Sequence, residues 1–425
     1  MQNPERQLLC YRPAKRQGMN EKYPFVKNVA SFFAILCILF IPFSFSLISF
    51  QLEFTDFVFG KLIGFVSDKL LGIHLKDTKV YSDFVSMYVL VMLLFILAVV
   101  AALIVARLNK WKQYRRKILG LCYTICCYYL ILQLLKYGFG KIFKDQFYLP
   151  EPNTLYTPLG QLDKDILYWS SMGTSRLYNL FSGSVEVLAA ILLLFKRTRM
   201  AGLLLATASL SQIVAINFSF DISVKLFSLF LLFLSLYLLN PFFNRLYHFF
   251  FTRSSIQAME WEASSLNKHP FLSVFFKCLI TGLIFFEALY PYFRKSNFND
   301  DVAKRPYLHG AYEVKQMIVG QDTLSANNFQ IKRFFIHRDS YLIFQNQADK
   351  MQDYKLSYNI DKYEYTLTDY QLKIVTVALK YNPTDSVLVV KYFKNDRQYE
   401  VTGKALDWKK LPLMNSGFHW TVDRY

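Results

Sequence analysis

The hydrophobic residues of this chain follow two different patterns along its length. Between about residues 29 and 293, apolar runs of about 20 residues carry few charges, whereas residues 294–425 alternate apolar and polar positions in short runs. A run of about 20 apolar residues is long enough to cross a bilayer as a helix. Helices that are apolar on every face suit a bundle surrounded by lipid. We therefore predict an α-helical integral membrane bundle followed by a strand-rich domain.

Seven membrane spans are predicted from the apolar runs. Segment 51–83, between the first two spans, has apolar residues at helical spacing among charged ones, which predicts an amphipathic helix in the membrane interface. We expect residues 29–117 to contain the first two spans, 118–243 to form a four-helix core, and 244–270 to be a cytoplasmic loop. The predicted spans cover 29–50, 84–106, 118–143, 177–195, 200–219, 224–243 and 271–293.

The distribution of basic residues predicts the orientation of the spans. If the basic tail at 1–28 is cytoplasmic, the segments on its side carry 18 Lys and Arg residues and the opposite segments carry 7. Cytoplasmic segments of membrane proteins are enriched in these residues. We therefore expect residues 294–425 on the periplasmic side of a bacterial inner membrane. The net charge is +18, and its strongest basic clusters lie directly beside apolar runs, which favours membrane lipid as a partner and argues against nucleic acid.

Residues 294–425 are predicted to form an antiparallel all-β domain. Turn-forming pairs such as Asn327-Asn328 and Asn395-Asp396 separate eight short runs in which apolar and polar residues alternate. Consecutive short strands of this kind are typical of a meander that closes into a small barrel or packs as a sandwich. The domain contains no cysteine, so it is not stabilised by disulfides.

Polar residues inside the spans are the main candidates for function, because a charge near the bilayer centre is costly unless it is paired or hydrated. Lys136 lies about two turns from the outer end of the third span, and Tyr129 and Gln133 share its helical face. Glu186 lies near the middle of the fourth span, too deep for its carboxylate to reach the headgroups. The later spans add Gln212, Asn217, Asp221, Lys225 and Glu287.

These polar residues are expected at similar depth in the outer half of the bilayer, where they would surround a shared pocket that opens outward. In the alternative, Lys136, Lys141 and Lys225 extend to the outer headgroups. Asp221 would then cap the sixth span, and Glu287 would pair with a lysine for assembly.

The chain lacks the sequence motifs of several large enzyme classes. No GxSxG, HExxH, GxxxxGK[ST] or GxGxxG sequence occurs, and the six histidines do not have the spacing of metal ligands. We therefore expect no metal site. A transporter is disfavoured because the sequence has no clear inverted repeat or pair of broken helices.

Two short motifs in the core resemble the DoxX-type family of membrane proteins. A Gly-x-x-Lys, Gly138 to Lys141, ends the first core helix, and a Gly-x-x-Glu, Gly183 to Glu186, lies in the second, followed by a basic turn at 196–199. The four-helix pattern also resembles the membrane part of vitamin K-dependent carboxylases, in which a strand-rich domain follows the spans. The chain differs from the bare DoxX pattern by its two leading spans, its seventh span and its strand-rich tail.

Two functions are compatible with these features. The DoxX resemblance implies quinone-linked redox chemistry, because some members are subunits of thiosulfate:quinone oxidoreductase. A quinone or another lipid-soluble substrate would then bind between the spans, with Glu186 handling protons and Lys136 or Lys141 setting its charge. The alternative is a non-catalytic membrane assembly or envelope factor whose outer β domain binds a protein, lipid or glycan.

Overall fold

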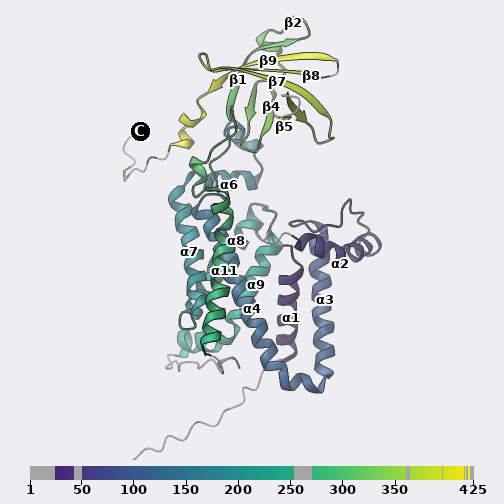
Figure 1. Cartoon of the computed structure of the whole chain (residues 1–425), viewed down its shortest axis with the longest axis vertical. Coiled ribbons are helices and arrows are strands. Elements are labelled where there is room, and N and C mark those ends of the chain that lie inside the picture. The colour runs from purple at the N-terminus through teal and green to yellow at the C-terminus, as the bar shows by residue number, and fades with distance from the viewer. Residues whose placement is uncertain are drawn as a thin grey trace, which may run out of the picture. The chain divides into compact units, whose positions relative to one another are not determined.

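The structure of the chain is a computed structural model (Figure 1). The chain folds into two compact units. Unit 1 comprises residues 1–43 and 50–126, and unit 2 comprises residues 44–49 and 127–425. Most of the predicted basic tail and of the predicted loop 244–270 lies outside the described residues. The structure describes residues 24–42, 50–252, 270–359, 364–394, 396–415, 417 and 420–421.

Six helices in the described part of the chain are long and apolar enough to cross a membrane. They correspond to the second to seventh predicted spans, so the predicted helical membrane bundle is confirmed. These apolar stretches cover Val85–Arg107, Asn109–Ile142, Arg176–Leu194, Arg199–Ser219, Lys225–Phe251 and Val274–Val302.

The first predicted span is shorter than expected. Helix α1, Pro24–Phe40, has 17 residues and ends well before residue 50, where the sequence pattern placed the end of the span. Pro42 accounts for this end, because proline has no backbone N–H and disfavours helical geometry in the residue before it. The N–H of Ile41 still donates to Cys37 O at 2.9 Å, and residues 43–49 of the predicted span lie outside the described residues.

Unit 1 contains α1, α2 (Gln51–Phe65), the π-helical turn η1 (Val66–Leu70), α3 (Val85–Arg107) and the first part of α4 (Asn109–Ile142). Side chains of α2 satisfy the carbonyl groups at the end of α1. Gln51 Nε2 donates to Ile38 O at 3.1 Å and to Leu39 O at 3.0 Å, and Thr55 Oγ1 donates to Phe40 O at 2.8 Å. The last turn of a helix leaves such carbonyls without partners inside the helix, so α2 completes α1.

Unit 2 contains the rest of α4, a set of helices around it, and the β domain. Every residue from Leu130 to Leu135 in α4 is at most 7% exposed, so this stretch is covered on all sides. Thr207 Oγ1 donates to Ser235 Oγ at 3.1 Å and joins α8 to α9. The long helices after α4 are α7 (Arg176–Leu194), α8 (Arg199–Ser219), α9 (Lys225–Leu239) and α11 (Pro270–Lys295).

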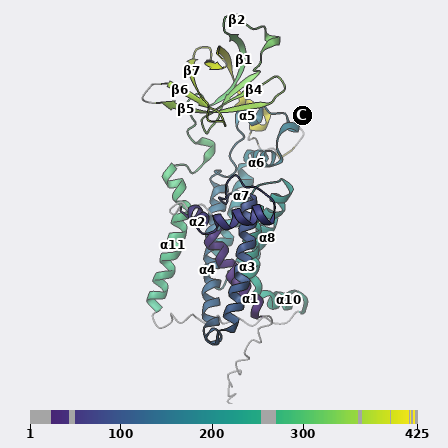
Figure 2. The same cartoon turned by 90° about the vertical axis from the view of Figure 1, so that its right-hand side faces the viewer.

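Short elements connect the long helices of unit 2 to each other and to the β domain, which lies at one end of them (Figure 2). The segment between α4 and α7 forms most of this connection. The elements are α5 (Pro152–Leu155), η2 (Leu159–Gln161), α6 (Lys164–Thr174), η3 (Asn240–Phe242), α10 (Phe243–Tyr247), η4 (His248–Thr252) and η6 (Asp300–Val302).

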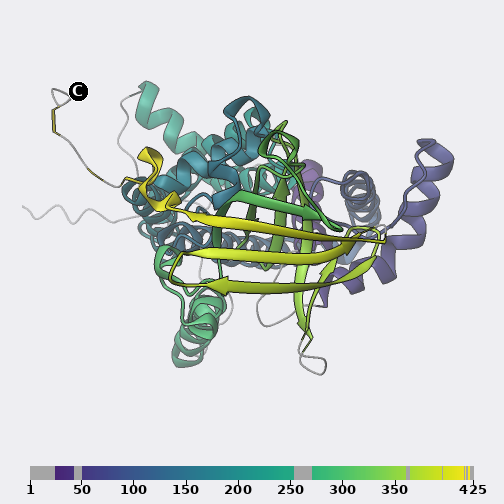
Figure 3. The same ribbon diagram turned by 90° about the horizontal axis from the view of Figure 1, so that it is seen from above.

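The β domain, seen from above in Figure 3, is an antiparallel barrel. It has eight strands, and all eight predicted strands are present. Each strand pairs with the next along the chain, and β9 returns to pair with β1, for example Met317 with Val401. This closure decides between the two predicted forms in favour of the barrel. Strands β1, β3, β4, β5, β6, β7, β8 and β9 cover Gly310–Val319, Arg333–Ile336, Tyr341–Gln345, Met351–Asn359, Glu364–Thr368, Ile374–Asn382, Val387–Lys394 and Arg397–Leu406, and β2 (Asp322–Thr323) extends the sheet beside β1.

Alternating residues of the strands fill the barrel interior, as the period of a β-strand requires. Phe334 is fully buried among them and stacks on Tyr312 with ring centroids 5.1 Å apart. Gly403 on β9 makes room for this ring, because a Cβ atom there would lie 2.4 Å from Phe334 Cε1. A glycine inside a strand often marks such a close approach. The interior consists of Tyr312, Val314, Met317, Phe334, Ile336, Leu342, Phe344, Leu367, Val377, Leu388, Val390, Tyr392 and Val401, with Ile331 beside them.

Candidate functional site

A buried ion pair joins α4 to α7 inside the bundle. The Lys141 ammonium donates to the Glu186 carboxylate, and the two residues are 6% and 1% exposed. Both were predicted catalytic residues, and the structure places them against each other. The second carboxylate oxygen of Glu186, Oε2, has no hydrogen-bond partner in the described part of the chain. The pair is therefore enclosed by protein, with one acceptor atom left over.

Two glycines bring α4 and α7 into backbone contact beside this ion pair. A Cβ atom on Gly183 would lie 2.5 Å from Gly138 O, and one on Gly138 would lie 2.9 Å from Gly183 O. Any larger side chain would push the helices apart. The Gly-x-x-Lys and Gly-x-x-Glu motifs thus face each other, with glycine against glycine and lysine against glutamate.

A second ion pair joins α4 to α11. Lys136 Nζ lies 3.5 Å from Glu287 Oε1, and Glu287 is 7% exposed. Tyr129, on the same helix, contacts Phe230 of α9 with ring centroids 6.1 Å apart. Gln133 is fully buried, and neither of its amide atoms has a hydrogen-bond partner in the described residues. The predicted pairing of Glu287 with a lysine is therefore present in the structure.

The remaining predicted residues do not join these pairs. Gln212 is exposed on α8, contrary to the expected shared pocket. Asp221 has an 82% exposed side chain and accepts from Lys225 at 2.7 Å in the turn between α8 and α9. Asn217 is buried nearby at 5% exposure. The position of a residue along a span predicts its depth in the membrane but not whether its side chain faces the neighbouring helices. For this reason Gln212 and Asp221 were predicted in the pocket, although their side chains are exposed.

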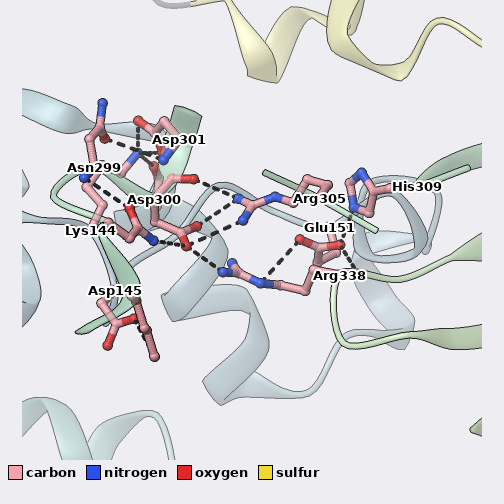
Figure 4. A network of polar contacts seen from close by, with 12 residues as sticks. Lys144, Asp145, Glu151, Asn299, Asp300, Asp301, Arg305, His309 and Arg338 are labelled. Atoms are coloured by element: carbon pink, nitrogen blue, oxygen red, sulfur yellow. Dashed lines mark hydrogen bonds and ion pairs between the residues drawn. The ribbon is translucent and has the colours of Figure 1, made fainter. Parts of the chain in front are cut away.

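A polar network that the sequence did not predict lies where the bundle meets the barrel (Figure 4). Lys144, just after α4, is 1% exposed and donates to Gly173 O at 2.6 Å and to Asp301 Oδ2 at 2.8 Å. Asp301 follows the exit of α11 by a few residues. One ammonium group therefore joins the end of α4, the end of α6 and the segment after α11.

Asp300, also after α11, is the centre of the same network. It is 1% exposed and accepts from Arg305 Nη2 at 2.8 Å and from Arg338 Nη2 at 2.6 Å. The two guanidinium groups compensate the cost of burying this carboxylate. Because Arg338 lies in the turn between β3 and β4, this contact attaches the barrel to the segment after α11.

Glu151 forms the other half of the network. It is 4% exposed, lies 2.8 Å from His309 Nε2, and accepts from the backbone N–H of Arg338 at 3.2 Å. Burial favours the protonated acid, yet the hydrogen bond and charge of His309, with that of His337, hold the pKa of Glu151 below its usual value. The guanidinium of Arg338 also lies 4.1 Å from the ring centre of Tyr148, a cation–π contact.

The segment between α4 and α7 continues from this network along the outside of the barrel. Tyr156 packs against Phe335 with ring centroids 6.1 Å apart, and the Arg333 guanidinium lies 4.9 Å from the Tyr156 ring. The Tyr156 carbonyl accepts from Gln345 Nε2 at 3.0 Å, which satisfies a fully buried amide. This segment is therefore a structural connection between bundle and barrel.

A cleft of about 460 Å³ opens beside the network. Four basic and three acidic residues line it together with apolar ones, and Val302 is 79% exposed there. Lys304 is also exposed. The signal in the sequence was the run of charged residues directly after the last span. Its partners include Arg338, 38 residues from Asp300, and Lys144, 157 residues from Asp301, so the run alone did not reveal the network. The lining residues are Asp145, Lys295, Ser296, Asn297, Phe298, Asn299, Asp300, Val302, Ala303, Lys304, Arg305, Arg338 and Asp339.

Comparisons with known proteins give one partial similarity. The uncharacterized protein YwoB of Bacillus subtilis (strain 168) is 42% identical to this chain over 71 residues. The similar region covers 17% of this chain and 46% of that protein, so the chain spans less than half of the relative's length. No protein-family model and no solved structure matches the chain. Within the described residues, no group of three or more His, Cys, Asp or Glu residues is placed to hold a metal ion.

Proposed function

We propose that this chain is a non-catalytic membrane assembly or envelope factor that uses the cleft between bundle and barrel to bind a protein partner. The observation that carries the proposal is the contrast between the two polar sites. Lys141 and Glu186 are enclosed and paired with each other, whereas the cleft is open and lined by exposed side chains such as Val302 and Lys304. A partner must reach the residues that bind it, and the cleft offers that access.

The chemistry of the cleft favours a protein as the partner. Val302 is 79% exposed and Phe298 is 43% exposed, and charges of both signs surround them. Large exposed apolar side chains within a polar rim are typical of protein–protein interfaces. Three of the four basic residues are already paired, Arg305 and Arg338 with Asp300, and Lys295 with Asp145 at 3.7 Å. The exposed Lys304 is therefore the cation that we assign to a partner.

The rigid attachment of the barrel supports a binding role. Buried ion pairs and hydrogen bonds from Lys144, Glu151 and Asp300 connect four segments of unit 2. A site held by rigid elements binds with a smaller loss of conformational entropy. We propose further that the barrel lies on the periplasmic side of a bacterial inner membrane, because the basic residues concentrate on the opposite side of the spans.

A photo-cross-linking residue at Val302, in the full chain in its host membrane, tests the proposal. We expect one discrete protein adduct, whose yield falls with Lys304→Glu and is unchanged with Lys380→Glu, a charge reversal on the exposed face of β7. A cross-linker at Ile374, which is 67% exposed on the barrel, is the matched control. Adducts with lipid alone, or equal protein adducts at both positions, would contradict the proposal.

A second candidate is the quinone-linked chemistry implied by the DoxX resemblance. Two features favour it: the facing Gly-x-x-Lys and Gly-x-x-Glu motifs, and the Glu186 Oε2 atom, which has no partner in the described residues. A buried acceptor of this kind is costly unless a water or ligand reaches it. The test supplies thiosulfate as the electron donor, since two thiosulfate ions give up two electrons on forming tetrathionate. Reduction of a soluble quinone analogue that depends on the purified protein and is abolished by Glu186→Gln would favour this candidate over the first.

A further inference from the structure

The corner between α3 and α4 in unit 1 concentrates positive charge at the end of a membrane span. A single residue, Leu108, separates the two helices, with φ −83° and ψ 120°. The segment 107–117 contains six Lys and Arg residues and no Asp or Glu. Since α3 is an apolar span that ends at Arg107, this charge lies at the level of the lipid headgroups.

An apolar cleft of about 320 Å³ lies within the same corner. Leu108, Trp111, Tyr114 and Ile118 line it together with Asn109 and Lys110. Tyr114 is 46% exposed and Ile118 is 37% exposed, so the cleft is accessible from outside the protein.

Contacts to α1 hold the corner in place. Arg115 Nε donates to Asn28 Oδ1 at 3.0 Å, and Arg115 Nη2 donates to Pro24 O at 3.1 Å. The Trp111 ring lies 5.7 Å from the Phe32 ring, measured between centroids. The cleft is therefore part of the packed structure of unit 1.

We propose that this corner is a binding site for a phospholipid with an anionic headgroup. The upper part of an acyl chain lies against Trp111 and Tyr114, and the ammonium groups of Lys110 and Lys112 bind the headgroup phosphate. Basic clusters directly beside a span attract anionic lipid, and an amphipathic aromatic surface suits the headgroup level. A soluble anion would use the charge but not the apolar cleft, and for this reason we assign the site to a lipid.

The test measures bound lipid on the full chain by native mass spectrometry, after exchange into nanodiscs that contain phosphatidylglycerol and phosphatidylcholine. We expect retained phosphatidylglycerol in preference to phosphatidylcholine. The double variant Lys110→Glu/Lys112→Glu is expected to lower that preference by about tenfold. The matched control is Lys196→Glu/Arg197→Glu, which makes the same charge change at the exposed turn between α7 and α8.

Two outcomes would overturn the proposal. Equal losses in the two double variants would mean that charge alone attracts the lipid, without a site. Unchanged retention in Ile118→Trp, which fills the cleft and leaves every charge in place, would mean that the apolar surface takes no part. Since neither result depends on the barrel, this test is independent of the proposed protein partner.

Discussion

Lys141 on α4 and Glu186 on α7 form a buried ion pair directly beside the place where Gly138 and Gly183 bring the same two helices into backbone contact. The close approach of the two helices and the ion pair depend on each other. Larger residues in place of the glycines would move Lys141 away from Glu186, and two separated charges inside the bundle would each be buried without a partner.

Removal of one partner of this pair should destabilise the bundle. We expect Lys141→Met to cost about 3–5 kcal/mol, because it leaves the Glu186 carboxylate buried and unpaired. The double variant Lys141→Met/Glu186→Leu removes both charges and should recover most of the loss. Thermal unfolding in detergent measures both effects. Equal stabilities of the single and double variants would show that the two groups are not coupled.

The glycine contact predicts a sharp difference between two alanine substitutions. In Gly183→Ala the new Cβ would lie 2.5 Å from Gly138 O, so α7 must move and the bundle should lose about 2 kcal/mol or more. Gly282→Ala on α11 is the control, because no atom lies within 4 Å of a Cβ there. Alanine favours a helix over glycine by about 1 kcal/mol, so the control should be neutral or slightly stabilising. Similar unfolding temperatures for the two variants would contradict the close contact.

Inside the barrel, Gly403→Ala should be strongly destabilising. The added methyl group would lie 2.4 Å from Phe334 Cε1, and that ring is fully buried among the other interior side chains. We expect a loss of about 1–3 kcal/mol, typical of overpacking. Phe334→Leu in the same chain should restore part of the stability by shortening the obstructing side chain. Circular dichroism during thermal unfolding can follow the barrel through its strand signal. If Phe334→Leu restores none of the stability lost in Gly403→Ala, the close contact between Gly403 and the Phe334 ring is contradicted.

The connection between bundle and barrel should weaken in acid. The pKa of Glu151 is lower in the folded protein than its ordinary value of 4.5. A carboxyl group of this kind stabilises the fold at pH above its unfolded pKa, and the contribution disappears as the pH falls through the folded pKa. We therefore expect the attachment of the barrel to loosen below about pH 4.5.

Hydrogen exchange in the segment after α11, followed from pH 6 to pH 3, measures this loosening. Glu151→Gln should raise exchange at pH 6 and make it less dependent on pH. Glu364→Gln, at an exposed position on β6, is the control and should change neither. If Glu151→Gln and the unmodified protein show the same pH dependence, the ion network does not hold the barrel.

Much of the fold could be predicted because it depends on local periodicity. Apolar runs identified six of the spans, and alternation identified all eight barrel strands. The early end of α1 shows the limit of that approach, since Pro42 overrides an apolar pattern that continues beyond it. Closure of the sheet could not be predicted, because the pairing of β1 with β9 joins residues about 90 positions apart.

The candidate site could be predicted only in part. Lys141 and Glu186 stood out because a charged residue inside a span is rare. The depth of each in the membrane followed from its position along its own predicted span. Glu151, Asp300 and Arg338 carried no such signal, because charged residues in connecting segments are ordinary. Only the folded chain shows that they are buried together.

Closure of the barrel limits how any partner can recognise this domain. Open sheets often bind peptides by β-augmentation, in which an incoming strand hydrogen-bonds to a free backbone edge. Here β1 pairs with β9 along most of its length and with β3 over Gly310–Glu313, and the two-residue strand β2 covers Ile318 and Val319. Closure therefore leaves only short backbone edges within the described sheet, and a partner of the barrel would be recognised mainly through exposed side chains.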